Sequence, residues 1–244
     1  MGPAEIPTYL EIGAKRTFAG ALDWPGWCRA GREEGAALEA LHDAARRYAR
    51  VLRGTRLGFE TPEDPSRFTV VERVQGDATT DFGAPSIAPT ADARPIDDAE
   101  LKRSRSILRA CWRSFDAAVD GARGTTLAKG PRGGGRDLRK IVDHVVDAEG
   151  SYLRMVGSKV EAARADDLAE RTHAAVLDAL ETMAREGPPP PGPRGGTRWL
   201  PRYFVRRVTW HVLDHAWEIE DRRSRAIGVN GGPVATAPRG TVEA

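Results

Sequence analysis

Two histidines near the C-terminal end of the chain, His211 and His215, have a spacing that is typical of metal binding. On an α-helix, this spacing places both imidazole rings on one face, about 6 Å apart. The sequence contains five histidines, and chance alone would produce such a pair roughly one time in ten. The pair therefore indicates a metal site only if the surrounding elements supply a further ligand.

A third histidine, His144, is expected to face the same interior as this pair. The pair lies in a helix predicted over about 201–222, and His144 lies in a helix predicted from about residue 137 to residue 155. Inward positions next to the histidines are apolar: Ile141, Ala148, Phe204, Val208 and Ile219. Three neutral imidazoles with a fourth position open are typical of a zinc or nickel site. The alternative is three buried histidines that are hydrogen-bonded within the core.

Two carboxylates are candidate catalytic residues because each follows a histidine by three positions. Asp147 follows His144, and Glu218 follows His215. At this spacing a carboxylate can orient the imidazole ring or transfer a proton near the metal. The alternative for both is a solvated side chain on the flank of the bundle.

Two other residues of the same helix are candidates for substrate binding. Arg207 lies four residues before His211 and could anchor an anionic substrate or a thiol carboxylate, with a surface arginine as the alternative. Trp210, like Trp217, is expected either to pack against another element or to form a pocket wall. His173, in the helix predicted over about 166–185, is a possible extra ligand, for which a structural role is favoured.

The elements that position these residues are four amphipathic segments joined by turns. Their apolar stripes predict a four-helix bundle over residues 97–225, in a protein of the mainly α class. Residues 226–244 contain few large apolar side chains and are predicted to form a flexible tail.

A smaller unit of different character precedes the bundle. Residues 1–75 contain short β-branched and aromatic stretches, one amphipathic helix over 33–52 and a further strand over 68–74. This pattern predicts a small α+β domain. Residues 76–96 are rich in Gly, Ala, Pro, Thr and Asp without periodicity, and they are predicted to be a linker.

The overall composition excludes several classes of protein. The 37 basic residues nearly balance the 35 acidic ones, so nucleic-acid binding is not expected. Cys28 and Cys111 are far apart and form no C-x-x-C motif, which argues against a disulfide framework. No apolar run approaches the ~20 residues of a membrane helix, and no signal peptide is recognised at the N-terminus. We therefore expect a cytoplasmic protein without membrane association.

The segments VDHVVDAE (142–149) and RVTWHVLDHAWE (207–218) resemble the DinB/YfiT-like superfamily of metal-binding four-helix bundles. The resemblance covers about residues 97–222. It implies that His144, His211 and His215 hold one divalent metal. Some members are transferases or isomerases that use mycothiol or bacillithiol, and many have no established activity. The Ala-, Arg- and Gly-rich composition suggests a GC-rich bacterial genome, which favours mycothiol.

The N-terminal unit is similar to the HicB-like antitoxin domain over about residues 8–74. The similarity rests on RTFAGALDWPGWCRAG (16–31) and EEGAALEAL (33–41), although Trp27 interrupts the family's Pro-Gly-Cys pattern. In physical terms the unit is expected either to cover one end of the bundle or to mediate self-association as a homodimer.

Three functional hypotheses follow from these observations. The first is a metal-dependent enzyme that activates a low-molecular-weight thiol toward a small-molecule substrate. The second is a non-enzymatic metal-binding or protein-interaction module. The third is a hydrolase in which the metal activates water.

Overall fold

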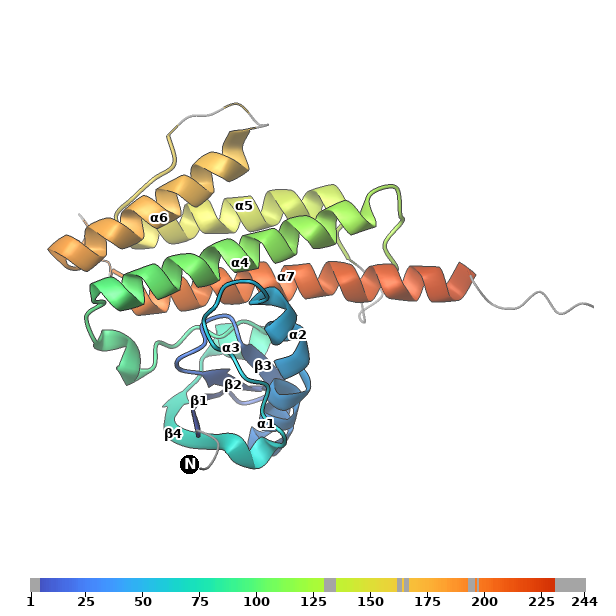
Figure 1. The fold of residues 1–244 in the computed structure, drawn as a ribbon, viewed down its shortest axis with the longest axis horizontal. Helices are drawn as coiled ribbons and strands as arrows, with labels where there is room; N and C mark the ends of the chain where they lie inside the picture. Colours follow the sequence, from blue (N-terminus) through green and yellow to red (C-terminus); the bar gives the residue numbers. More distant parts are fainter. Residues whose placement is uncertain are drawn as a thin grey trace, which may run out of the picture.

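The computed structural model describes residues 5–129, 135–161, 164, 167–192, 196 and 198–230, with side chains described as far as residue 226. Within these residues the chain forms seven α-helices and one four-stranded sheet. Four long helices pack together as a bundle, and the sheet with the short helices lies against one side of it (Figure 1). The predicted combination of a mainly helical chain with a small sheet is confirmed.

The sheet has the strand order β3-β2-β1-β4. Strands β1 (Ile6–Ile12), β2 (Thr17–Ala21) and β3 (Cys28–Gly31) pair antiparallel, as expected for strands joined by short turns. Strand β4 (Phe68–Gln75) instead pairs parallel to β1 at the other edge. A parallel pair needs a crossover connection, and the segment between β3 and β4, which includes two helices, provides it.

The helix predicted over 33–52 is divided into α1 (Glu34–Asp43) and α2 (Ala45–Val51), with Ala44 between them. From α2, the Tyr48 hydroxyl donates to the carbonyl of Pro25 at 2.8 Å, and its ring stacks on Trp27 at 5.8 Å. Trp27 Nε1 donates to the carbonyl of Leu41 in α1 at 2.8 Å. Both helices are therefore fixed to the turn between β2 and β3.

The second face of the sheet is covered by the last helix of the bundle, α7 (Pro201–Asn230). Phe18 packs edge-on against Trp210 of α7, with ring centroids 6.1 Å apart. The Tyr9 ring lies over Gly20, where an added Cβ would come within 2.4 Å of the ring, and the guanidinium of Arg206 lies 5.3 Å from the centroid of Tyr9. The sheet is therefore enclosed by helices on both faces, and its position relative to α7 is fixed.

The other bundle helices are α4 (Asp98–Ala122), α5 (Leu138–Met155) and α6 (Leu168–Glu186). They correspond to the segments predicted from their apolar stripes, and they run lengthwise beside α7 (Figure 1). Helix α7 continues to Asn230, beyond the end expected near Arg222, and the rest of the predicted tail, 231–244, lies outside the described residues. None of the helices in the described part of the chain is sufficiently long and apolar to cross a membrane.

Residues 76–96, predicted to be a linker, are folded against the sheet and α7. They include the short helix α3 (Ala78–Phe82) and a 3-10 turn at Thr90–Ala93. The buried carboxylate of Glu11 accepts the backbone N–H groups of Ser86 and Ile87 at 2.9 and 3.1 Å. Asp92 forms a buried ion pair with Arg206 of α7 at 2.7 Å. Polar contacts with partners distant in sequence therefore order this segment despite its turn-rich composition.

Candidate metal centre and adjoining cavity

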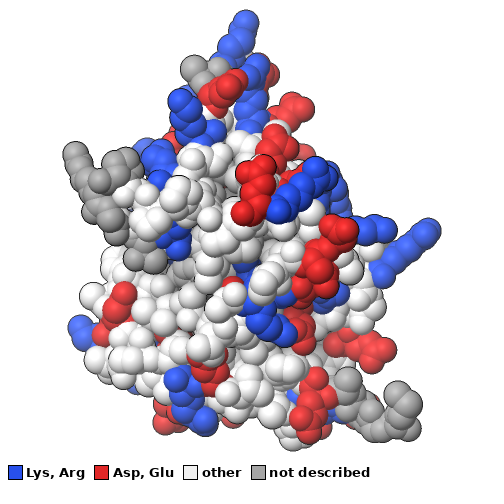
Figure 2. Space-filling view, turned by 90° about the vertical axis from the view of Figure 1, so that its left-hand side faces the viewer, with Lys and Arg blue, Asp and Glu red and all other residues white. Residues whose placement is uncertain are grey.

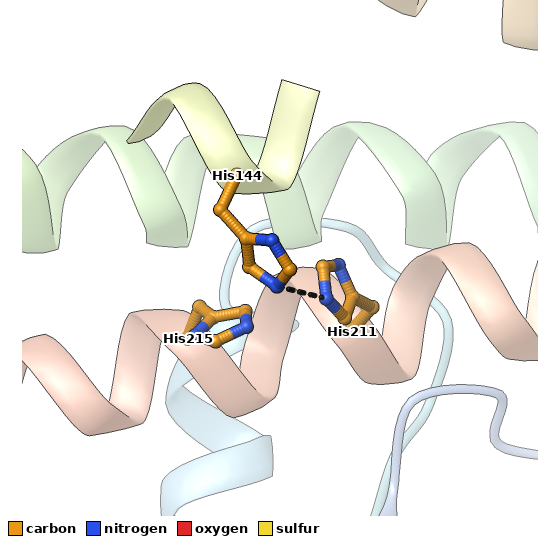
Figure 3. A group of neighbouring side chains, drawn as sticks. All are labelled: His144, His211 and His215. Carbon is orange, nitrogen blue, oxygen red and sulfur yellow. Dashed lines mark hydrogen bonds between the residues drawn. The ribbon is translucent and has the colours of Figure 1, made fainter. Parts of the chain in front are cut away.

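The structure brings His144 of α5 together with His211 and His215 of α7. Figure 3 shows the three imidazole rings converging between the two helices. The Nε2 atoms of His144 and His211 are 3.3 Å apart, and one nitrogen from each of the three rings lies within 4.8 Å of the others. The predicted meeting of the three histidines is confirmed, whereas binding of a metal stays a prediction.

Helix geometry explains this convergence. His211 and His215 lie one turn apart on α7, and both are buried. His144 is half-buried and lies directly before Val145, which is buried. It therefore lies at the edge of the apolar stripe of α5. The packing of α5 against α7 turns this edge toward the histidine pair.

The donor geometry fits a small divalent cation. In a tetrahedral site with Zn–N distances of 2.0–2.1 Å, the ligand nitrogens are about 3.3–3.4 Å apart. The Nε2–Nε2 distance between His144 and His211 already has this value at 3.3 Å. Small movements of the rings would bring the remaining separations, which reach at most 4.8 Å, into the same range. A hydrogen bond between two neutral imidazoles would also place these two atoms at this distance.

Glu218 orients one of the three rings. Its Oε2 accepts the Nδ1 proton of His215 at 2.8 Å, and its Oε1 accepts from Nη1 of Arg222 at 2.7 Å. With the proton on Nδ1, the His215 Nε2 lone pair is free to bind a metal. By contrast, His211 Nδ1 is buried without a hydrogen-bond partner among the described residues. Of the two candidate roles for Glu218, the geometry favours orientation of His215.

Burial and mutual repulsion favour the neutral forms of His144 and His211. Burial lowers the pKa of His211 well below its ordinary value, and the neighbouring His215 and His144 lower it further. Burial likewise lowers the pKa of His144, with a smaller contribution from Arg136. The hydrogen bond from His215 is the largest cause of the lowered pKa of Glu218. Neutral imidazoles are the form that binds a metal.

The histidines line a cavity of about 650 Å³ between the bundle and the N-terminal unit. Its bundle wall includes Tyr152 of α5 and Trp210 of α7, and its opposite wall includes Phe18 of β2 and Phe82 of α3. A cavity of this volume is in the range of small-molecule sites. The N-terminal unit therefore lies over the side of the bundle that carries the histidines.

Arg207 and Trp210, the predicted substrate-binding residues, both line this cavity. Arg207 is buried, which excludes the surface position considered as its alternative. Its guanidinium lies 5.0 Å from the Trp210 ring centroid and 5.4 Å from that of Tyr152. Trp210 is both a pocket wall and a packing residue, since it also contacts Phe18.

The other candidate residues lie away from the cavity. Asp147 is exposed on α5, outside the lining, although its charge raises the pKa of His144 against the larger effect of burial. His173 stacks on Trp112 with ring centroids 4.0 Å apart, and its Nε2 lies 3.5 Å from a carboxylate oxygen of the fully buried Glu149. A packing role for His173, as favoured from the sequence, agrees with these contacts.

Several lining residues were not identified from the sequence. Tyr152 lies eight residues after His144 on α5, a spacing of about two turns, so helical periodicity could have placed both on one face. Arg16, before β2, and Arg136, before α5, lie in connecting segments without periodicity. Nothing in the sequence around them indicates which surface they line.

Comparisons of the chain with protein-family models, curated proteins and solved structures gave no match.

Proposed function

We propose that this chain binds a divalent metal ion through His144, His211 and His215, and that it is a metal-dependent enzyme acting on a small molecule. The observation that carries the proposal is the convergence of three imidazole donors in the wall of the cavity. The hydrogen bond between His215 and Glu218 supports it, since metal-binding histidines commonly donate their second ring N–H to a carboxylate.

The proposed reaction class is the activation of a low-molecular-weight thiol, with mycothiol or bacillithiol as the co-substrate. A divalent ion in this site would lower the pKa of a thiol or water molecule at its remaining position. Imidazole donors favour zinc or nickel. The preference for a thiol over water rests on the resemblance of residues 142–149 and 207–218 to the DinB/YfiT-like superfamily.

Metal analysis tests the binding proposal directly. The full chain is purified from metal-replete cells beside the double variant His211→Ala/His215→Ala, and both are analysed for zinc and nickel. We expect one metal ion per wild-type chain and none in the variant. Circular dichroism checks that the variant is folded. A wild-type protein without stoichiometric metal would falsify the proposal.

A thiol titration tests the reaction class. The protein is loaded with Co²⁺, whose absorption reports a new sulfur ligand, and is titrated with mycothiol or bacillithiol. We expect a thiolate-to-cobalt charge-transfer band that is absent from the double variant. If the spectrum is indifferent to thiols while the metal is bound, the thiol proposal is wrong and a hydrolase or a non-enzymatic metal-binding module takes its place.

A further inference from the structure

Positive charge dominates the lining of the cavity. Four arginines line it, namely Arg16, Arg29, Arg136 and Arg207, whereas Asp214 is the sole carboxylate among the described lining residues. Asp214 is already paired with Arg29 at 3.4 Å. On the outer face shown in Figure 2, by contrast, acidic and basic side chains are interspersed. The excess of positive charge is therefore a local property of the cavity in a chain of nearly balanced charge.

Arg207 is the buried member of this group, with an exposed fraction of 8%. Its Nη1 donates to the carbonyl of Pro85, its Nη2 donates to the Tyr152 hydroxyl at 3.3 Å, and its Nε has no hydrogen-bond partner. Within the described part of the chain it forms no ion pair with a carboxylate. Burying a guanidinium without a counter-charge costs free energy. An anion bound next to Arg207 would recover part of this free energy.

Aromatic side chains from both units surround this charge. Tyr152 and Trp210 come from the bundle, and Phe18 and Phe82 come from the N-terminal unit. Phe82 is 76% exposed although it lines the cavity, which is a high exposure for a large apolar side chain. These rings favour a ligand with a planar, apolar body, because aromatic faces gain most from contacts with such groups.

We propose that the cavity binds a small organic carboxylate, with its charge next to Arg207 and its apolar body between the aromatic rings of the two units. Arg16, whose guanidinium lies against Gly83 at the end of α3, contributes positive charge from the N-terminal unit. The N-terminal unit is thereby half of the binding site. Binding of the carboxylate does not depend on the proposed function. Its role as the substrate of a metal-dependent reaction does rest on that function.

Benzoate and benzamide are suitable probes, since they share size and shape and differ in charge. Both are titrated by calorimetry into the metal-free full chain in the presence of a chelator. We expect benzoate to bind at least about 10-fold more tightly than benzamide, the ratio associated with a charge-assisted hydrogen bond. Arg207→Met and Arg16→Met should each bring the ratio toward one. Arg109→Met changes an exposed arginine of α4 outside the cavity and should preserve the ratio.

Equal affinities for the two probes, or no benzoate binding in the millimolar range, would overturn the proposal. An unchanged ratio in Arg16→Met would refute the contribution of the N-terminal unit. Thermal unfolding checks each variant, and if Arg207→Met does not fold, Arg16→Met decides the result. Metal content is measured on the same preparations before the chelator is added. If the chain prefers benzoate in an arginine-dependent way but binds no metal, the metal proposal alone is overturned. If it binds metal but shows no such preference, the carboxylate proposal alone is overturned.

Discussion

The substitution Glu218→Gln should weaken metal binding without removing a ligand. The Glu218 carboxylate accepts hydrogen bonds from both His215 and Arg222, at 2.8 and 2.7 Å. A glutamine amide has one acceptor oxygen, so it can satisfy only one of the two donors. If its NH₂ group faces His215, the ring proton moves to Nε2 and occupies the metal-binding lone pair. If the NH₂ group faces Arg222, it opposes the N–H donors of the guanidinium and no hydrogen bond forms there.

The expected loss is about 10-fold in metal affinity. Substitution of a residue that is hydrogen-bonded to a metal ligand costs about 10–100-fold in metal affinity, and a hydrogen bond to a charged group contributes about 1.5–3 kcal/mol. The Glu218 side chain is 32% exposed, so solvent screens part of its charge. We therefore expect a loss of metal affinity at the lower end of the range of about 10–100-fold. A 10-fold loss corresponds to about 1.4 kcal/mol.

A competition titration with a chromophoric zinc chelator at neutral pH measures this loss. Glu220→Gln is the matched control, because Glu220 lies two residues further along α7 and pairs with Arg47 instead of a histidine. We expect Glu220→Gln to bind zinc as the wild type does, and His215→Ala to lose most of its affinity. If Glu218→Gln binds within about twofold of the wild type while His215→Ala is impaired, the carboxylate does not orient the ligand and the reasoning is refuted.

Three further predictions concern the cluster and its surroundings. Because burial lowers the pKa of His211 and of His144 and protons compete for the metal-binding form, the loss of zinc affinity with falling pH should begin at a lower pH than it does for exposed histidines. Affinity that falls steeply above pH 7 in the chelator titration would contradict this prediction. Asp92→Asn breaks the buried ion pair with Arg206 and should lower the free energy of unfolding by about 3–5 kcal/mol. Urea denaturation measures this loss, and a change below about 1 kcal/mol, as is typical of a surface pair, would exclude a stabilising role. His173→Gln should leave zinc affinity unchanged in the same titration, since His173 stacks on Trp112, and a 10-fold loss would identify it as a ligand.

The bundle and the histidine cluster could be predicted because helical periodicity is a local property of the sequence. His211 and His215 occupy positions of an apolar stripe where a leucine would be expected, and His144 adjoins such a stripe. Two helices that bury their stripes against each other bring these positions together, so no long-range information was needed beyond the packing of α5 on α7.

The cavity could not be predicted, because its walls come from segments far apart in the chain. Phe18, near the start of the chain, packs against Trp210 in the last helix. The sequence around either residue does not show which residue it contacts. The prediction of a linker over 76–96 omits its folded structure for the same reason. Its order depends on the Glu11 carboxylate and on Arg206, which supply partners from a strand and from the last helix. Local composition indicates a turn-rich segment but not what it folds against.

The central position of α7 has a consequence for the order of events during synthesis. This helix carries two of the three histidines, covers one face of the sheet and packs along α4, yet it leaves the ribosome after every other described element. Until then, Phe18 lacks its contact with Trp210, the side of α4 that packs on α7 is uncovered, and His144 lacks the other two histidines of the cluster. The proposed metal site, which needs all three histidines, is therefore complete only after α7 has been synthesised. Since N-terminal units generally begin to fold first, the sheet exposes Phe18 until the last helix arrives.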